Sequence, residues 1–426
     1  MTRIPSTRLL SVVFALTALA AGSGCSAFEA PAVRPCAWLD RVSDDASGDT
    51  GETRPRTVVL VDRSSSTRPD KAAGPGLRVP DWAATLVAAE GLAPPELEGG
   101  FLSVAGFDGT RATVDWGVDH VSITSVKGND TLKKDRRSVQ RRCLEKRLRE
   151  LSAGAPGTDR TDVLGALAAA ADRLGSAKGD RKIVVATDGL TNTGCADLRS
   201  AGFDGTAEIK ATVDRCRRAG ELPDLKGAEV GILGIGRSPR GEAPSSPQTA
   251  WLSALWTQLC EATGASSCEV TATAHTREAE AEKRATAGTA EPQVTYPAVS
   301  ERPKGRVTTI TLPGSVLFDT DRSELSPAAQ STLDGAARRI RELDPVLIAV
   351  SGHTDSRGSE RHGRQLSLAR GQAVRSALAE RGIAVDSAHG YSDDRPACTP
   401  EYRDGIPDFA AMACNRRVEI AVTVRQ

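Results

Sequence analysis

An oxygen-rich cluster of side chains follows a short apolar run near the start of the sequence. The run Val58–Val61 leads directly into D-x-S-x-S, and two further oxygen-bearing residues stand where a helical pattern begins and where a later apolar run ends. Carboxylate and hydroxyl oxygens are hard ligands that suit Mg²⁺, and also Ca²⁺ or Mn²⁺. The pattern predicts a divalent-cation site made by Asp62, Ser64, Ser66, Thr161 and Asp188.

A simpler interpretation of the same residues is local capping. Ser64 and Ser66 could cap a helix, and Asp188-Gly189 could form a turn. All the positions together, each on a suitable element, favour the cation site. No general base or nucleophile accompanies the cluster, so we expect binding and no enzymatic activity.

A second pair of residues could bind an amino acid. Asp355 ends an apolar run, and Arg370 lies in the helical pattern that follows it. A carboxylate beside a guanidinium can hold an ammonium and a carboxylate at once, because arginine binds carboxylates in bidentate fashion. The alternative is a surface ion pair with little energetic weight.

The elements that must position these residues alternate between strands and helices. From 56 to 272, apolar runs at 58–61, 101–107, 183–186 and 230–236 predict strands, and 82–89, 132–151, 163–174 and 251–262 predict helices. This alternation predicts a doubly wound, mainly parallel α/β sheet. Ligands of such sheets bind beyond the carboxyl ends of the strands, where Asp62 and Asp188 fall.

A smaller α/β unit with a βαβ-type core is predicted for 306–426. Ser326-Pro327 would begin a helix, with the serine as N-cap. A strand at 346–350, a helix at 366–379 and a strand at 418–424 follow. Between the two units, 273–305 contains a run of Glu, Ala and Lys and then prolines, which predicts a linker.

The N-terminus has the pattern of an export signal. Arg3 and Arg8 precede an apolar run, Leu9 to Ala21, which is shorter than the roughly 20 residues that span a bilayer. The run ends before Cys25 in a sequence that resembles a bacterial lipobox. We expect a signal peptide at 1–24, lipidation of Cys25 and a tether at 25–55, so that the protein is exported, lipid-anchored to the cell membrane or an outer membrane, and faces the cell wall. The alternative is a plain signal peptide with an incidental cysteine.

The cysteines and the charges also bear on location and partners. Besides Cys25 there are eight cysteines, an even number that suggests four disulfides in an exported protein. Spacing favours three of the pairs and elimination leaves the fourth, although connectivity stays open: Cys195–Cys216, Cys260–Cys268, Cys398–Cys414 and Cys36–Cys143. Lys plus Arg and Asp plus Glu both number 55, and aromatics make up 4%, so neither charge nor stacking predicts a nucleic-acid partner.

The predicted cation site resembles the metal-ion-dependent adhesion site of von Willebrand factor A domains, over about 56–272. The resemblance implies that Asp62, Ser64, Ser66, Thr161 and Asp188 form the first and second coordination shells. In that family the ion keeps an open position, which a carboxylate of a partner protein often completes. The resemblance therefore implies a bound Mg²⁺, or Ca²⁺ or Mn²⁺, and an unidentified protein ligand.

The smaller unit resembles the OmpA-like peptidoglycan-binding domain, over about 306–426. The residues that carry the resemblance are "VLFDTDRSELSPAAQSTLD", "GHTDSRGSERHGRQLSLARGQAV" and "NRRVEI". It implies that Asp355 holds the amine and Arg370 the carboxylate of diaminopimelate in the peptide stem of the wall. Further positions would shape the pocket: Phe318, Asp319, Asn415, Arg416 and Arg417. His362 and Gly363 stand where the family has tyrosine and asparagine.

Together these patterns predict a lipid-anchored envelope protein that binds peptidoglycan through one domain and a protein partner through a cation in the other. One alternative is an accessory subunit or metal-assisted enzyme of cell-wall metabolism, which would need a general base near Asp62 and Asp188. Another alternative is a stress or secretion-system sensor whose first domain has lost its ion.

Overall fold

The computed structural model describes residues 36–41, 53–68, 76–176, 178–241, 243–279, 291–319 and 321–425. The predicted signal peptide and Cys25 lie outside these residues, so export and lipidation stay predictions. Within the described part of the chain, no helix combines the length and the apolar composition that crossing a membrane requires.

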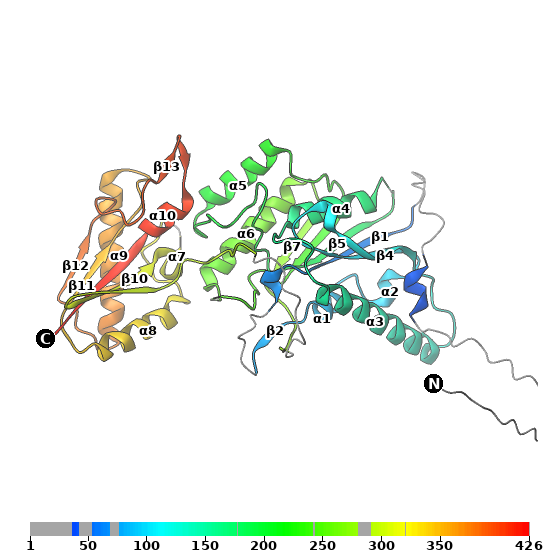
Figure 1. Cartoon of the computed structure of the whole chain (residues 1–426), viewed down its shortest axis with the longest axis horizontal. Coiled ribbons are helices and arrows are strands. Elements are labelled where there is room, and N and C mark those ends of the chain that lie inside the picture. Colours follow the sequence, from blue (N-terminus) through cyan, green and yellow to red (C-terminus); the bar gives the residue numbers. More distant parts are fainter. Residues whose placement is uncertain are drawn as a thin grey trace, which may run out of the picture.

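The first domain is built on a six-stranded, mainly parallel sheet, which confirms the predicted α/β class (Figure 1). Its strand order is β4-β3-β1-β5-β6-β7, and β4 alone runs antiparallel to its neighbour. All residues of β1 are buried, as expected for a central strand that is covered on both faces. The strands are β1 (Arg56–Asp62), β3 (Phe101–Phe107), β4 (Asp115–Ser122), β5 (Arg181–Ala186), β6 (Ala228–Leu233) and β7 (Ser267–Thr271).

Helices cover both faces of this sheet (Figure 1). Val59 and Val61 of β1 point into a core shared with α1 (Trp82–Val87) and α3 (Asp130–Ala153). Val58 and Leu60 point to the opposite core, which contains side chains of three other helices. These are α4 (Val163–Leu174), α5 (Thr206–Ala219) and α6 (Ser246–Ala262). A short helix, α2 (Pro94–Leu97), precedes β3.

Parts of the predicted tether and linker are packed against the domains. Cys36 is disulfide-bonded to Cys143 on α3, and Leu39, in a 3-10 turn at Ala37–Asp40, is buried in the core of the first domain. In the predicted linker, β8 (Thr276–Glu278) pairs with β2 (Arg78–Pro80). Further on, β9 (Ser300–Lys304) joins the sheet of the second domain. The described parts of both segments therefore have fixed positions.

The second domain has a five-stranded sheet in the order β12-β11-β15-β10-β9. One face carries Ile310, Val350 and Ile420, which pack against α8 and α9. Its strands are β10 (Val307–Pro313), β11 (Pro345–Gly352), β12 (Ser387–Gly390) and β15 (Arg417–Val424), together with β9 and a separate hairpin of β13 (Tyr402–Arg403) and β14 (Ile406–Pro407). Its helices are α7 (Gly314–Leu317), α8 (Ala329–Glu342), α9 (Glu360–Glu380) and α10 (Phe409–Asn415).

The predicted start of α8 is wrong by two residues. The helix begins at Ala329 and its N-cap is Ala328, without a capping side chain. Ser326 and Pro327 form a preceding turn, in which the carbonyl of Ser326, and not its hydroxyl, accepts the N–H of Ala329. The Ser326 hydroxyl is buried and has no hydrogen-bond partner in the described structure.

Four disulfides link the cysteines of the described residues. They join Cys36 to Cys143, Cys195 to Cys216, Cys260 to Cys268 and Cys398 to Cys414. These are the three pairs that sequence spacing favours and the fourth that remains by elimination. Three of them close short loops within one domain, whereas the Cys36–Cys143 bond spans a sequence separation of 107 residues.

Candidate functional site

The carboxyl end of β1 positions the first part of the predicted cation site. Asp62 is fully buried; its Oδ1 accepts the N–H of Ser64 at 2.8 Å, and its Oδ2 accepts the hydroxyl of Thr187 at 2.6 Å. The hydroxyls of Ser64 and Ser66 are 3.0 Å apart. The turn after β1 thus gathers one carboxylate and two hydroxyls in a buried position.

Thr161 and Asp188 come to the same edge of the sheet from α4 and β5. Thr161 precedes α4, and its N–H donates to Oδ1 of Asn192 at 2.8 Å. Asp188 follows β5 and is fully buried; its Oδ1 accepts the N–H of Leu190 at 2.9 Å, whereas its Oδ2 has no hydrogen-bond partner in the described structure. Such an orphaned buried oxygen is what a cation ligand leaves when no ion is present.

Burial and a neighbouring acid disfavour the charged form of each aspartate. Burial, and then the charge of Asp188, raises the pKa of Asp62 to about 8, against hydrogen bonds from Ser64 and Thr187. Burial also raises the pKa of Asp188 to about 6, to which the charge of Glu291 adds, against hydrogen bonds from Leu190 and Ser66. A cation between these groups would relieve the repulsion.

The donor set fits a hard cation only if the hydroxyls take part. Among the described residues, no three Asp, Glu, His or Cys side chains are arranged so that they could hold a metal by themselves. Ser64, Ser66 and Thr161 supply the additional oxygens, and such a set suits Mg²⁺, which keeps several of its waters. The five predicted residues therefore lie where a cation could be bound, but the site depends on neutral ligands.

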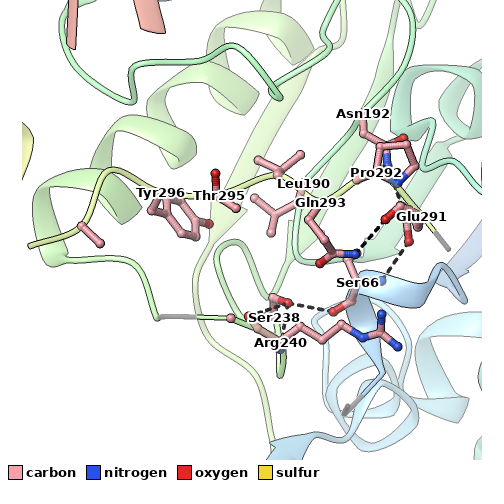
Figure 2. Close-up of a pocket in the computed structure, with 13 residues that line it drawn as sticks. Ser66, Leu190, Asn192, Ser238, Arg240, Glu291, Pro292, Gln293, Thr295 and Tyr296 are labelled. Carbon is pink, nitrogen blue, oxygen red and sulfur yellow. Dashed lines mark hydrogen bonds between the residues drawn. The ribbon is translucent and has the colours of Figure 1, made fainter. Parts of the chain in front are cut away.

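Sequence reasoning missed Glu291, Asn192 and Thr187 at this site. Glu291 belongs to the predicted linker, and Figure 2 shows its carboxylate directed toward Ser66 and Asn192. The linker covers one side of a cavity of about 590 Å³, whose lining also includes Ser238 and Arg240. No sequence pattern distinguishes Glu291 from the other acids of its segment.

The second predicted pair has one member in the loop after β11 and the other on α9. Asp355 is three residues beyond β11, is 6% exposed, and forms ion pairs with Arg357 at 2.6 Å and Arg416 at 2.5 Å. Arg370, on α9, is 3% exposed; its Nε donates to the carbonyl of Arg322 at 2.8 Å, and its guanidinium lies 5.0 Å from the centroid of the Phe318 ring. Both predicted residues are therefore buried and held in place.

The other predicted positions divide into two groups. Phe318 and Arg416 contact the pair directly, as described above. Asn415 and Arg417 fix the surrounding chain, because Asn415 Oδ1 accepts the N–H groups of Ala397 and Cys398 at 2.7 and 3.0 Å, and Arg417 pairs with Glu419 at 2.7 Å. Asp319 follows Phe318 in the chain and is exposed. His362, which departs from the family pattern, pairs with Asp321 at 2.7 Å.

A carboxylate of the first domain reaches into this second site. Arg416 bridges two acids: Nη1 contacts Asp355 at 2.5 Å, and Nε contacts Asp204, in the loop before α5, at 2.7 Å. Arg416 is 6% exposed. Burial lowers the pKa of Arg370, and the nearby charge of Asp204 makes the largest contribution that opposes this effect. Asp204 therefore lies within electrostatic range of both arginines.

The loop that carries Asp204 is fixed by Glu208 of α5. The carboxylate of Glu208 is 3% exposed and accepts the N–H of Gly202 at 2.8 Å. Gly202 in turn packs so closely on α10 that a Cβ would lie 2.7 Å from the carbonyl oxygen of Phe409. Figure 1 shows α7 and α10 on the side of the second domain that faces α5 and α6. The two domains therefore meet at the loop of Asp204.

Glu208 makes the stability of this loop pH-dependent. Burial raises its pKa to about 7, against hydrogen bonds from Gly202 and Asp204 and the charge of Arg416. A raised folded-state pKa gives stability that is present below the unfolded value of about 4.5 and is lost as the pH rises through about 7.

We expect Glu208→Gln, which keeps an acceptor for Gly202, to become more stable than wild type by up to about 3 kcal/mol at pH 8 and equal to it near pH 4. Urea unfolding across this range checks it, and a constant difference would contradict it.

Comparisons with known proteins identify the family of the second domain. Residues 317–404 match the model of the OmpA family. Outer membrane protein A of Shigella flexneri is 35% identical over 136 residues, which are 30% of this chain and 39% of that protein. Outer membrane protein P5 of Haemophilus influenzae is 34% identical over 119 residues, which are 27% of this chain and 34% of that protein. The chain thus spans less than half the length of these relatives.

Among solved structures, the cell wall anchor of the T6SS from Pseudomonas aeruginosa is 30% identical to this chain, with a TM-score of 0.26. It matches 30% of this chain and 88% of that one. The family match and the relatives together show that the C-terminal domain is an OmpA-like domain. The first domain is not identified by them, and its resemblance to von Willebrand factor A domains stays a prediction.

Proposed function

We propose that the chain binds peptidoglycan non-covalently through its OmpA-like domain. The observation that carries the proposal is the placement of Asp355 and Arg370, two buried groups of opposite charge on adjoining elements of that domain. By the resemblance of the domain, Asp355 takes the ammonium and Arg370 the carboxylate of diaminopimelate in a stem peptide. Charge-assisted contacts of this kind are the strong ones among hydrogen bonds.

The surroundings of the pair support a prepared binding site. The ring of Phe318 and the carbonyl of Arg322 hold the Arg370 guanidinium in one orientation, so little rotamer freedom is lost when a ligand binds. Burial raises the pKa of Asp355, but hydrogen bonds from Arg357 and the charges of Arg416 and Arg357 outweigh it, and the net pKa is lowered. Asp355 is therefore ionised at neutral pH, as an ammonium ligand requires.

Sedimentation of the mature chain with purified wall sacculi tests this function. We expect Asp355→Ala and Arg370→Ala each to weaken binding about 10- to 100-fold, because each removes a charge-assisted contact worth about 1.5–3 kcal/mol. Asp393→Ala and Arg375→Ala are matched controls, since both residues are exposed in the same domain and Arg375 lies on α9. Unchanged pelleting of both test variants would refute the proposal.

A second candidate function concerns the first domain, which we propose binds a divalent cation, with Mg²⁺ preferred. Asp62, Ser64, Ser66, Thr161 and Asp188 would hold it, and the cation would supply a positive centre that attracts a carboxylate. The observation that favours it is the unpartnered Oδ2 of fully buried Asp188 beside Asp62. Loss of Mn²⁺ binding in an Asp62→Ala variant tests this candidate.

We further propose that the protein is exported and held to a membrane by a lipid on Cys25, and that it acts by binding and not by catalysis. Four disulfides in the described residues accord with an oxidising compartment. A lipid at one end and a wall-binding domain at the other would reinforce each other, because the second attachment takes place at a high effective concentration.

A further inference from the structure

Glu291 rests directly on residues of the proposed cation site. Its Oε1 accepts hydrogen bonds from the hydroxyl of Thr161 and from Nδ2 of Asn192, the latter at 2.9 Å. Its Oε2 accepts the hydroxyl of Ser65 and, at 3.1 Å, the N–H of Ser66. The side chain is 6% exposed, and Figure 2 shows it between the loops that carry Ser66 and Asn192. One carboxylate thus joins the loops after β1 and β5 to Thr161 in the loop that leads into α4.

The chain around Glu291 is held independently of its carboxylate. Asn192 Nδ2 also donates to the carbonyl of Pro292 at 3.0 Å. Further along, Nε2 of Gln248, on α6, donates to the carbonyl of Pro297 at 2.8 Å. The segment 291–298 is therefore attached to the first domain through its backbone. The position of Glu291 is set by these backbone contacts as well as by the contacts of its side chain.

The charge at this site is unbalanced. Asp62 and Asp188 are completely buried, and Glu291 is 6% exposed. Within the described ranges, no salt bridge joins any of the three to a lysine or arginine, and Asp188 Oδ2 has no hydrogen-bond partner. Buried carboxylates of this kind are stabilised by a counter-charge, and a divalent cation supplies it.

We propose that Glu291 is an internal ligand of the cation site. Its carboxylate takes the coordination position that a partner protein would otherwise complete, so the cation fastens segment 291–298 to the first domain. The inference rests on the proposed cation site and adds a ligand from this chain. A carboxylate of another protein then has to displace Glu291, and binding of such a partner would remove one of the contacts that hold segment 291–298, while the contacts of Pro292 and Pro297 would remain.

Titration with Mn²⁺ tests the inference, because this ion reports both its affinity and its bound waters. Electron paramagnetic resonance measures free Mn²⁺, and water-proton relaxation measures how many exchangeable waters the bound ion keeps. For the mature chain we expect Glu291→Ala to weaken Mn²⁺ binding by at least about tenfold and to raise the relaxation per bound ion, since water replaces the carboxylate. Glu278→Ala is the matched control, because Glu278 is exposed on β8 in the same predicted linker.

The variants separate the two proposals. If wild type binds no Mn²⁺, or Asp62→Ala binds it as well as wild type does, the cation site itself is refuted. If wild type binds and Asp62→Ala does not, but Glu291→Ala matches wild type in affinity and relaxation, only Glu291 is refuted as a ligand. Should circular dichroism show that Glu291→Ala is misfolded, Glu291→Gln takes its place, with the same expected loss of affinity, since the amide keeps the hydrogen-bond acceptor but not the charge.

Discussion

Replacing Asp204 by alanine is expected to strengthen binding of the mature chain to wall sacculi by about tenfold. In the described structure, Asp204 and Asp355 share the buried guanidinium of Arg416, and the charge of Asp204 also acts on Arg370. A carboxylate of a stem peptide would have to compete with this carboxylate of the first domain. An ion-paired contact of this kind is worth about 1.5 kcal/mol. Its removal would raise the fraction of molecules in which Arg416 is not paired with Asp204, and hence the apparent affinity for sacculi, by about tenfold.

The control for this experiment is Asp197→Ala. Asp197 also lies between β5 and α5 and is also paired with an arginine, but its partner Arg199 belongs to the same domain. We expect sedimentation of the control to match wild type. Equal or weaker binding by Asp204→Ala would show that the contact with Arg416 supports the wall site or is irrelevant to it.

Gly352→Ala is expected to have the largest effect on the second domain. A Cβ at Gly352, the last residue of β11, would lie 1.9 Å from the carbonyl oxygen of Ser367 and 3.2 Å from the backbone nitrogen of Gly371. Both atoms belong to the backbone of α9, so no side-chain rotation can relieve the clash. The helix has to move away from the sheet, at a cost of about 3 kcal/mol or more. Because α9 carries Arg370, the arrangement of Asp355 and Arg370 that is proposed to bind the wall should be lost as well.

Two measurements follow this variant. Thermal unfolding should show a lower midpoint for the second domain, and sedimentation with sacculi should fall to the level of Arg370→Ala. Gly335→Ala is the control: Gly335 lies on α8, where the nearest atom to an added Cβ is the flexible end of Arg338 at 3.8 Å, and alanine favours helix. Native stability and native binding of Gly352→Ala would contradict the close packing of α9 on β11.

Elements with a strong apolar pattern could be predicted from the sequence. The bounds of β3 (Phe101–Phe107) and α4 (Val163–Leu174) agree with prediction, because every residue of the strand and most of the helix are buried. Helix α5 was not predicted. Its buried side includes Glu208 and Thr212, so the periodic signal is weak. The buried positions of a helix cannot be recognised from hydrophobic periodicity when polar residues occupy some of them.

The same limit applies to the sites. The five predicted cation ligands follow strands or precede a helix, so parallel-sheet geometry brings them to one edge without further information. Glu291 and Asp204 could not be predicted in that way. Glu291 contacts Ser66 across 225 residues of sequence, and Asp204 contacts Arg416 across 212. Such contacts depend on how the linker and the two domains are placed, which no repeat or motif encodes.

The disulfide between Cys36 and Cys143 determines how the protein would bear mechanical load. It encloses β1, β3 and β4 within one covalent loop. A pulling force applied at the two ends of the chain passes from Cys36 straight to Cys143 on α3, so these three strands carry no tension along their backbones. If the protein is stretched between a membrane and the wall, β1 and the proposed cation ligands at its end would therefore keep their structure under a load that could otherwise separate the strands. Reduction of the Cys36–Cys143 bond would remove this protection.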